Sequence, residues 1–267
     1  MRLANKTAIV IGAGQGPGSG MGNGRATVIR FAQEGARVLA VDRDLASAQE
    51  TCAMAAKEDG GTCEAFEADV TRETSMQATI AHAKQRLGRI DILHYNVGVS
   101  LAGGDAAPEA ITEEAFDRIV GINLRGLVMV CKHVLPVMRA QKSGVILGIS
   151  SIAAIENYPY VTYKATKAAM IAYLQQLAIH EAGNGIRANV ILPGLMDTPM
   201  AVDTRARHSG KSRAEVAAMR DSHVPLRHKM GTAWDVANAA LFLASDEANF
   251  ITGVALPVDG GALVKIG

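Results

Sequence analysis

Short apolar runs alternate with longer segments of helical periodicity along the whole chain. This alternation is typical of βαβ units, which build a parallel sheet. The apolar runs are continuous, as in AIVI and VILGI, which is expected when helices cover both faces of a sheet. The sequence therefore predicts an α/β fold, a Rossmann-like doubly wound parallel sheet with helices on both faces.

The predicted strands and helices follow one another without a linker that would divide the chain, so we expect one domain over residues 1–267. A polar stretch at about 196–224 carries one short amphipathic piece, Arg213–Arg220, and is interpreted as a lid-like insertion. The expected strands span 7–11, 37–41, 63–68, 90–95, 145–150, 187–192 and 254–258, and the expected helices 25–34, 45–58, 74–87, 113–140, 163–182 and 233–244.

The charge balance narrows the class of partner. Lys plus Arg number 27 and Asp plus Glu 26, so nucleic acid and anionic membrane are not expected as main partners. No run reaches the length of a transmembrane helix, and the N-terminus lacks the pattern of a secretory signal. We therefore expect a cytoplasmic protein.

The cysteine and histidine spacings indicate neither a disulfide nor a metal site. Cys52, Cys63 and Cys131 are odd in number and form no CxxC pair, so we interpret them as packing residues in a reducing compartment. The seven histidines show no metal-ligand pairing, and no metal is expected.

A glycine-rich turn of unusual length separates the first predicted strand from the first predicted helix. It runs from Gly12 to Gly24, and glycine lets a backbone approach a ligand closely. The start of the following helix offers free N–H groups to a pyrophosphate. The literal GxGxxG and P-loop patterns are absent, so the turn by itself could be a flexible loop. We expect the extra segment 13–21 to wrap the pyrophosphate.

Asp42 ends the second predicted strand, 18 residues after Gly24. A carboxylate at this distance accepts hydrogen bonds from the ribose hydroxyls of NAD in dinucleotide folds. It would repel the 2′-phosphate of NADP, so Asp42 favours NAD, although the adjacent Arg43 acts in the opposite direction. An ordinary turn carboxylate is the alternative interpretation.

Tyr163 and Lys167 are four residues apart near the start of a predicted helix, so their side chains share one face. An ammonium beside a phenol stabilises the phenolate, and such a tyrosine can act as general acid or base. Ser150 and Ser151 end the preceding strand, where a hydroxyl can donate to a substrate oxygen. A YxxxK pair alone is common by chance.

These motifs occur in an order that resembles the short-chain dehydrogenase/reductase family, over nearly the whole chain. The ending ITGVALPVDGG also looks like the last strand and turn of that family. The matching positions are Gly12, Gly22 and Gly24 in the turn, then Asp69-Val70, Tyr95-Asn96-Val97-Gly98, Asn123, Ser151, Tyr163, Lys167, Pro193-Gly194 and Thr198.

The resemblance implies catalytic roles for four residues. Tyr163 would give or take the proton, Lys167 would lower the pKa of Tyr163 and contact the nicotinamide ribose, and Ser151 would position the substrate oxygen, with Ser150 as the alternative. Asn123 would hold a water that links Lys167 to solvent, because an amide inside a helix competes with helical hydrogen bonds. A buried asparagine that caps a local backbone group is the other interpretation of Asn123.

The same resemblance implies that the remaining matches bind NAD. Asp69 and Val70 would contact the adenine, Asn96 the adenine-side ribose region, and Thr198 the carboxamide. The other expected cofactor-binding residues are Gly12, Gly22, Asn23, Gly24, Asp42, Gly98, Tyr163, Lys167, Pro193 and Gly194.

The sequence thus predicts an NAD-dependent oxidoreductase that interconverts a secondary alcohol and a ketone, and the resemblance implies a homotetramer. A non-catalytic NAD-responsive regulator is the alternative, and an epimerase or dehydratase is a third candidate. The identity of the small-molecule substrate stays open. Five basic residues of the 196–224 stretch would attract a carboxylate or phosphate, or simply form a solvated face: Arg205, Arg207, His208, Lys211 and Arg213.

Overall fold

The computed structural model describes residues 1–57 and 61–265 and contains one seven-stranded parallel sheet. The strand order is β3-β2-β1-β4-β5-β6-β9, so the chain crosses over between β3 and β4 as in a doubly wound fold. The strands are β1 (Thr7–Ile11), β2 (Arg37–Asp42), β3 (Cys63–Glu67), β4 (Ile92–Tyr95), β5 (Gly144–Ile149), β6 (Ile186–Pro193) and β9 (Ala255–Val258).

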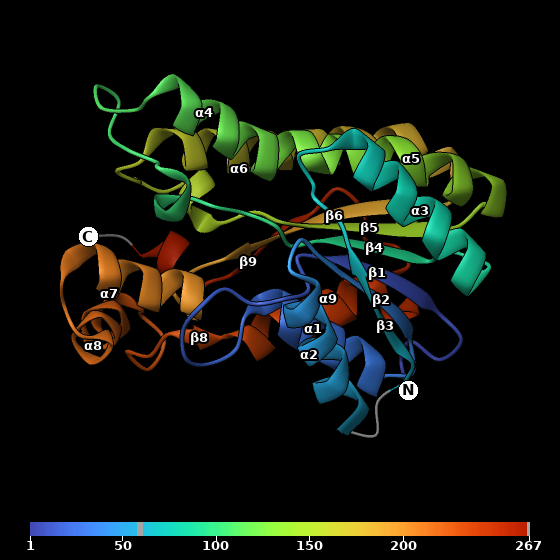
Figure 1. Cartoon of the computed structure of the whole chain (residues 1–267), viewed down its shortest axis with the longest axis horizontal. Helices are drawn as coiled ribbons and strands as arrows, with labels where there is room; N and C mark the ends of the chain where they lie inside the picture. The colour runs from blue at the N-terminus through green and yellow to red at the C-terminus, as the bar shows by residue number, and fades with distance from the viewer. Residues whose placement is uncertain (58–60, 266–267) are drawn as a thin grey trace.

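Helices cover both faces of this sheet (Figure 1). One layer holds α3 (Glu73–Leu87), α4 (Glu113–Val120), α5 (Gly126–Gln141) and α6 (Val161–Glu181). The other layer holds α1 (Asn23–Gln33), α2 (Leu45–Lys57) and α9 (Ala233–Ala244). Between β6 and α9 lie β7 (Met196–Asp197), the π-helical turn η5 (Pro199–Asp203), α7 (Thr204–Ser209), α8 (Arg213–His223) and β8 (Gly231–Thr232).

The apolar runs form these strands because both faces of the sheet are buried. Along β1, Ile9 and Ile11 pack into the core beneath α3, α5 and α6, while Ala8 and Val10 pack beneath α1 and α9. Successive side chains of a strand point to opposite faces, so a strand covered on both sides must be apolar throughout. The predicted fold class is confirmed.

Most predicted elements agree with the structure to within two residues at each end. The exception is the helix expected over 113–140, which the structure divides into α4, a π-helical turn η2 (Gly121–Arg125) and α5. Two positions near the expected end of the second helix, Glu58 and Gly60, lie outside the described residues.

The combined helix Glu113–Gln141 is long and apolar enough to cross a membrane by length and composition, with a mean hydropathy of 1.3. We did not expect such a segment. Four of its apolar side chains, Leu127, Val130, Val134 and Met138, are fully buried in the core beside α3 and the sheet. This packing is that of a core helix.

Cys52 on α2 and Cys63 on β3 are joined by a disulfide, whereas Cys131 is free and buried. Our interpretation of all three cysteines as unpaired packing residues is therefore wrong for the first two. Disulfides persist in oxidising compartments, so this bond does not support the reducing compartment that we inferred. The spacing held no signal, because α2 and β3 pack side by side only in the folded chain.

The connection between β1 and α1 requires glycine at two positions that the sequence analysis identified. Gly12 follows β1 with a φ of +83°, which disfavours other residues. Gly24 lies in the first turn of α1, where a Cβ would collide with the carbonyl oxygen of Gly12 and lie 2.6 Å from Nδ2 of Asn96. The close approach of α1 to the end of β1 therefore depends on the missing side chain.

We expect Gly24→Ala to lower the free energy of unfolding by roughly 1–3 kcal/mol, because the added methyl overpacks the turn. Helix propensity alone would give the opposite sign, since alanine exceeds glycine by about 1 kcal/mol in a helix. Urea denaturation followed by circular dichroism measures the change. Gly16→Ala is the matched control, because a Cβ at Gly16 meets nothing within 4 Å; equal losses in both variants would contradict the packing argument.

Candidate active site

A cavity of about 670 Å³ lies at the carboxyl ends of the sheet strands. Ligands of open α/β sheets bind at this edge, near the point where the strand order reverses. Every predicted site residue lines it except Asn123, which is buried behind it. The lining includes Gly12, Gly22, Asn23, Gly24, Asp42, Asp69, Val70, Asn96, Gly98, Ser151, Tyr163, Lys167, Pro193, Gly194 and Thr198.

Lys167 on α6 is 2% exposed, and its amine is held by main-chain carbonyls rather than by a carboxylate. Nζ donates to the carbonyl of Ile149 at 2.7 Å and to that of Val97 at 3.4 Å. Burial lowers the pKa of Lys167 to about 7, because desolvation disfavours the charged amine. Gly98 makes room for it, since a Cβ there would lie 2.8 Å from Nζ.

Tyr163 lies one turn before Lys167, and the Lys167 amine is 5.7 Å from the centre of its ring. Burial raises the pKa of Tyr163 to about 12, and hydrogen bonding to Ser151 and the charge of Arg205 act in the opposite direction. We expected Lys167 to lower this pKa; the net shift is upward because burial outweighs the opposing groups, and the contribution of Lys167 stays a prediction. Burial itself lowers the pKa of the Lys167 amine to about 7, so only about half of its positive charge remains near neutral pH.

The two serines after β5 differ in orientation. Ser150 is buried, and its hydroxyl donates to the carbonyl of Lys167 at 2.8 Å. Both serines line the cavity, but the Ser151 hydroxyl hydrogen-bonds Tyr163, and its oxygen accepts from the N–H of Ala153 at 3.1 Å. The geometry therefore favours Ser151 as the hydroxyl that can reach a substrate.

Asn123 is the central residue of the π-helical turn η2. Its side chain accepts from the N–H of Val99 at 2.8 Å and donates to the carbonyl of Val99 at 3.0 Å and to the hydroxyl of Thr166 at 3.1 Å. These bonds tie the loop after β4 to α6. Asn123 thus satisfies backbone groups, but those of Val99, 24 residues away, rather than of its own turn, and π-helical turns are frequent at functional sites.

Asp105 is a residue that the sequence reasoning missed. Its carboxylate is 6% exposed and accepts from the N–H groups of Thr162 at 3.1 Å and Tyr163 at 3.0 Å, at the start of α6. A carboxylate at a helix N-terminus satisfies free N–H groups and is favoured by the helix dipole. Asp105 thereby orients Tyr163, and a separation of 58 residues left no local signal in the sequence.

The start of α1 has the features of a pyrophosphate-binding turn. The N-cap Gly22 offers no side chain to the free N–H groups of the helix. Asn23 lines the cavity, and its Oδ1 is buried without a hydrogen-bond partner among the described residues. A buried acceptor without a partner is costly, so a ligand that donates there would be favoured. These groups fit a bound dinucleotide.

Several predicted contact residues already shape the edge of the cavity. Asn96 donates to the carbonyl of Gly12 at 3.0 Å and so holds the glycine turn against β4. Asp42 accepts from the N–H of Gly14 at 2.8 Å, and it lines the cavity together with Arg43. Asp69 accepts from the N–H of Thr71 at 2.9 Å. The carboxylates of Asp42 and Asp69 keep further lone pairs with which to accept hydrogen bonds from a ligand.

Residues that follow β6 form the edge of the cavity opposite the glycine turn. Thr198 is 6% exposed, and its hydroxyl accepts from the N–H of Ala201 at the start of η5. Gly194 follows β6, and a Cβ there would lie 2.7 Å from the backbone of Asp259. Pro193 ends β6 beside Val258 of β9. The chain thus turns tightly over the sheet edge at this point.

The extra glycine segment does not lie free in solvent. The N–H of Ser19 donates to Asp203 at 3.2 Å, and Arg207 donates to the carbonyl of Pro17 at 3.2 Å. The segment 13–21 therefore contacts η5 and α7, and Figure 1 shows the loop before α1 reaching toward α7 and α8. The two segments that border the cavity support each other.

The five basic residues of 196–224 do not share one role. Arg213 is paired with Asp197 and with Asp203, and Arg207 bonds the glycine segment. Lys211 is exposed outside the cavity. Arg205 and Arg207 line the cavity, and Nη2 of Arg205 is 3.3 Å from the hydroxyl of Tyr158. His208 is exposed as well.

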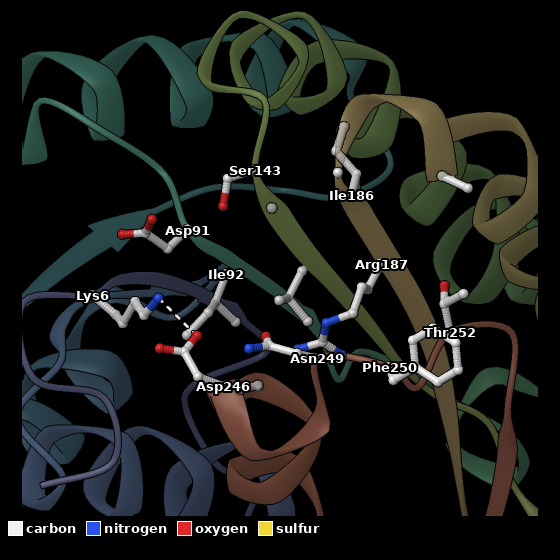
Figure 2. A pocket seen from close by; sticks show the side chains of 15 residues that line it. Lys6, Asp91, Ile92, Ser143, Ile186, Arg187, Asp246, Asn249, Phe250 and Thr252 are labelled. Carbon is white, nitrogen blue, oxygen red and sulfur yellow. Dashed lines mark hydrogen bonds and ion pairs between the residues drawn. The ribbon is translucent and has the colours of Figure 1, made fainter.

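A second cavity, of about 390 Å³, lies at the amino-terminal edge of the sheet (Figure 2). Its charged side chains have partners within the chain. Lys6 is 3.0 Å from Asp246, Asp91 is 2.6 Å from Arg89, and Arg187 donates to three main-chain carbonyls. Residues 1–57 and 61–265 contain no cluster of three or more His, Cys, Asp and Glu side chains that could hold a metal ion.

The sequence and the fold of this chain are similar to those of known proteins. A family model described as enoyl-(acyl carrier protein) reductase matches residues 16–262. The crystal structure of a putative short-chain dehydrogenase/reductase from Burkholderia xenovorans is 41% identical, has a TM-score of 0.91, and is matched over 100% of this chain and 99% of that one.

Two curated relatives are similarly complete matches. The 3-oxoacyl-(acyl-carrier-protein) reductase of Thermotoga maritima is 33% identical over 99% of this chain and 100% of its own length. The 2-(R)-hydroxypropyl-CoM dehydrogenase of Xanthobacter autotrophicus is 32% identical over 96% of this chain and 98% of its own.

A parallel sheet with a glycine-rich turn after β1 and a tyrosine–lysine pair at its carboxyl edge defines a dinucleotide-fold protein. The chain belongs to the short-chain dehydrogenase/reductase family, and it is an oxidoreductase. Members of this family use nicotinamide cofactors.

The lowered pKa of Lys167 predicts how stability changes with pH. This pKa is about 7 in the folded chain and near its ordinary value of 10.5 in the unfolded chain, so the unfolded chain binds more protons between these values. The free energy of unfolding contributed by Lys167 should therefore rise with pH across that window, by up to about 1.4 kcal/mol per unit. Below pH 7 this contribution stays at its minimum.

Urea denaturation at pH 7, 8 and 9 measures this effect as the difference between the parent and Lys167→Met. Other titrating groups cancel in that difference. A difference that is independent of pH would show that the amine keeps its ordinary pKa in the fold.

Proposed function

We propose that this protein interconverts a secondary alcohol and a ketone with NAD as the hydride carrier. The observation that carries the proposal is the single cavity that Ser151, Tyr163 and Lys167 share with the glycine turn and Asp42. A substrate beside Tyr163 would then lie next to the nicotinamide of a dinucleotide held by the turn at α1.

The bound nicotinamide would supply or accept the hydride. In ketone reduction, the hydroxyl of Tyr163 gives its proton to the carbonyl oxygen, while Ser151 donates a hydrogen bond to the same oxygen. A Tyr163 pKa of about 12 keeps the phenol protonated near neutral pH, as this donor role requires. Alcohol oxidation needs the phenolate, so its rate should increase with pH.

Lys167 and Asp105 support this chemistry from behind the tyrosine. Asp105 holds the first N–H groups of α6, which sets the position of Tyr163 over the cavity. The Lys167 amine lies against the main chain after β4 and β5, where it can also donate to a ribose hydroxyl of the cofactor. Asn123 keeps the loop after β4 in register with α6.

Further parts of the proposal follow from the family and the arrangement of the chain. We propose that the active form is a homotetramer, as the family resemblance implies. We also propose that the stretch at about 196–224 acts as a lid over the substrate end of the cavity, because Thr198, Met200 and Arg205 of this stretch line it.

We expect Tyr163→Phe to lower kcat/KM at least about 100-fold, since removing a general acid or base typically costs this much. Absorbance at the NADH band, with a panel of secondary alcohols and ketones, measures turnover. Tyr160→Phe is the matched control, because Tyr160 lies three residues away and does not line the cavity. An undiminished rate for Tyr163→Phe would overturn the mechanism, and cofactor binding without any turnover would favour a regulator.

We expect kcat/KM with NAD to exceed that with NADP by at least about tenfold, which corresponds to ~1.4 kcal/mol. The physical reason is repulsion between Asp42 and a 2′-phosphate. Asp42→Ala should reduce this ratio, and Arg43→Ala should increase it, because Arg43 borders the same part of the cavity with the opposite charge. A parent enzyme that prefers NADP would contradict the assignment of Asp42.

A further inference from the structure

Arg220, in the last turn of α8, is a buried cation without an ion-pair or hydrogen-bond partner among the described residues. It is 7% exposed and lines the cavity. Its guanidinium makes no hydrogen bond or ion pair with any residue that the structure describes, and its Nε is fully buried. A buried charge is normally paired, so an unpaired arginine in a ligand cavity indicates a missing anion.

A second guanidinium lies close to Arg220. Arg205 on α7 donates to the carbonyl of Ala201 at 3.0 Å and to the hydroxyl of Tyr158 at 3.3 Å, and it also lines the cavity. Burial and the charge of Arg205 together lower the pKa of Arg220 to about 10. Two cations that disfavour each other are stabilised by an anion that both can bind.

The nearby carboxylates do not supply that anion. Asp197 and Glu156 attract Arg220 electrostatically, but neither forms an ion pair with it among the described residues. Asp197 is paired with Arg213 instead. Burial raises the pKa of Glu156, and its attraction for Arg220 involves no direct ion pair among the described residues.

The position of the two arginines points to the substrate rather than the cofactor. Tyr158, which bonds Arg205, has its ring centre 5.6 Å from that of Tyr163. Arg205 also lowers the pKa of Tyr163, so its charge reaches the proposed proton donor. The glycine turn and Asp42 would hold the phosphates and adenosine of the cofactor away from this end.

We propose that the substrate carries a carboxylate, which Arg205 and Arg220 bind beyond the ring of Tyr158 while its carbonyl or carbinol carbon faces Tyr163. The substrate class is therefore an oxo acid or the corresponding hydroxy acid. A planar carboxylate matches the donor geometry of guanidinium groups. This inference rests on the proposed alcohol–ketone oxidoreduction.

The test compares acids with their neutral esters. Reduction of 3-oxobutanoate, 4-oxopentanoate and 5-oxohexanoate is measured with NADH and NADPH beside the three methyl esters. For at least one chain length, we expect kcat/KM of the acid to exceed that of its ester about 10- to 100-fold, the range for a hydrogen bond to a charged group. This acid-to-ester ratio should fall to near one in Arg220→Met and stay unchanged in Lys211→Met.

Lys211→Met removes an equal charge from the same segment outside the cavity, so it controls for general electrostatic attraction. Glu156→Gln tests whether the Glu156 carboxylate, rather than a substrate, is the anion that Arg220 binds. If Glu156 were the true partner of Arg220, this substitution would impair folding stability and leave the acid-to-ester ratio unchanged. We expect it instead to raise the ratio, because a competing carboxylate is removed.

Stability gives an independent readout. We expect Arg220→Met to unfold at the same temperature as the parent or a higher one, because it removes an unpaired buried charge. A large fall in Tm would identify Arg220 as a structural residue and overturn the inference. We also expect 4-oxopentanoate to raise the Tm of the parent more than that of Arg220→Met.

The outcomes separate this inference from the function on which it rests. Reduction of esters as fast as acids, with no Tm shift that depends on Arg220, would overturn the carboxylate site alone. Failure to reduce any acid or ester, with the Arg220-dependent Tm shift intact, would count against the proposed reaction and support the anion site.

Discussion

The amine of Lys167, buried against the carbonyl of Ile149, is the contact on which the rest of the site depends. Nζ of Lys167 donates to a carbonyl at the end of β5 and to another in the loop after β4, so one atom of α6 contacts both segments. A buried amine without a carboxylate is costly. The packing of α6 against the core through Met170 and Leu174 offsets this cost, because these side chains are fully buried.

Buried polar groups gather at this edge of the sheet, where a purely structural protein would place apolar ones. Lys167 and Arg220 are buried basic residues that form no ion pair with a carboxylate among the described residues. Asn23 has a buried oxygen without a hydrogen-bond partner in the same part of the chain. Such groups lower stability, and they persist where a ligand completes them. Their distribution follows the proposed ligand, with Asn23 at the cofactor end and Arg220 at the substrate end.

The two ends of the cavity are also connected mechanically. The glycine segment 13–21 borders the cofactor end, and residues 196–224 border the substrate end. Ser19 bonds Asp203, and Pro17 accepts from Arg207, so a change in one segment alters the support of the other. This contact accounts for the extra length of the glycine turn. Binding of a pyrophosphate alone would not require that length.

Local sequence was sufficient for the sheet, because strands buried on both faces must be continuously apolar, and for the ordered motifs from Gly12 to Thr198 that revealed the family. It was also sufficient to bring Tyr163 and Lys167 onto one helix face, since helical spacing is a local property. Only the tertiary structure decided the Cys52–Cys63 disulfide and the hydrogen bond from the start of α6 to Asp105. It also decided that Nε of Arg220 is buried without a hydrogen-bond partner among the described residues. Pairing and desolvation depend on residues far apart in the chain, so no local pattern determines them.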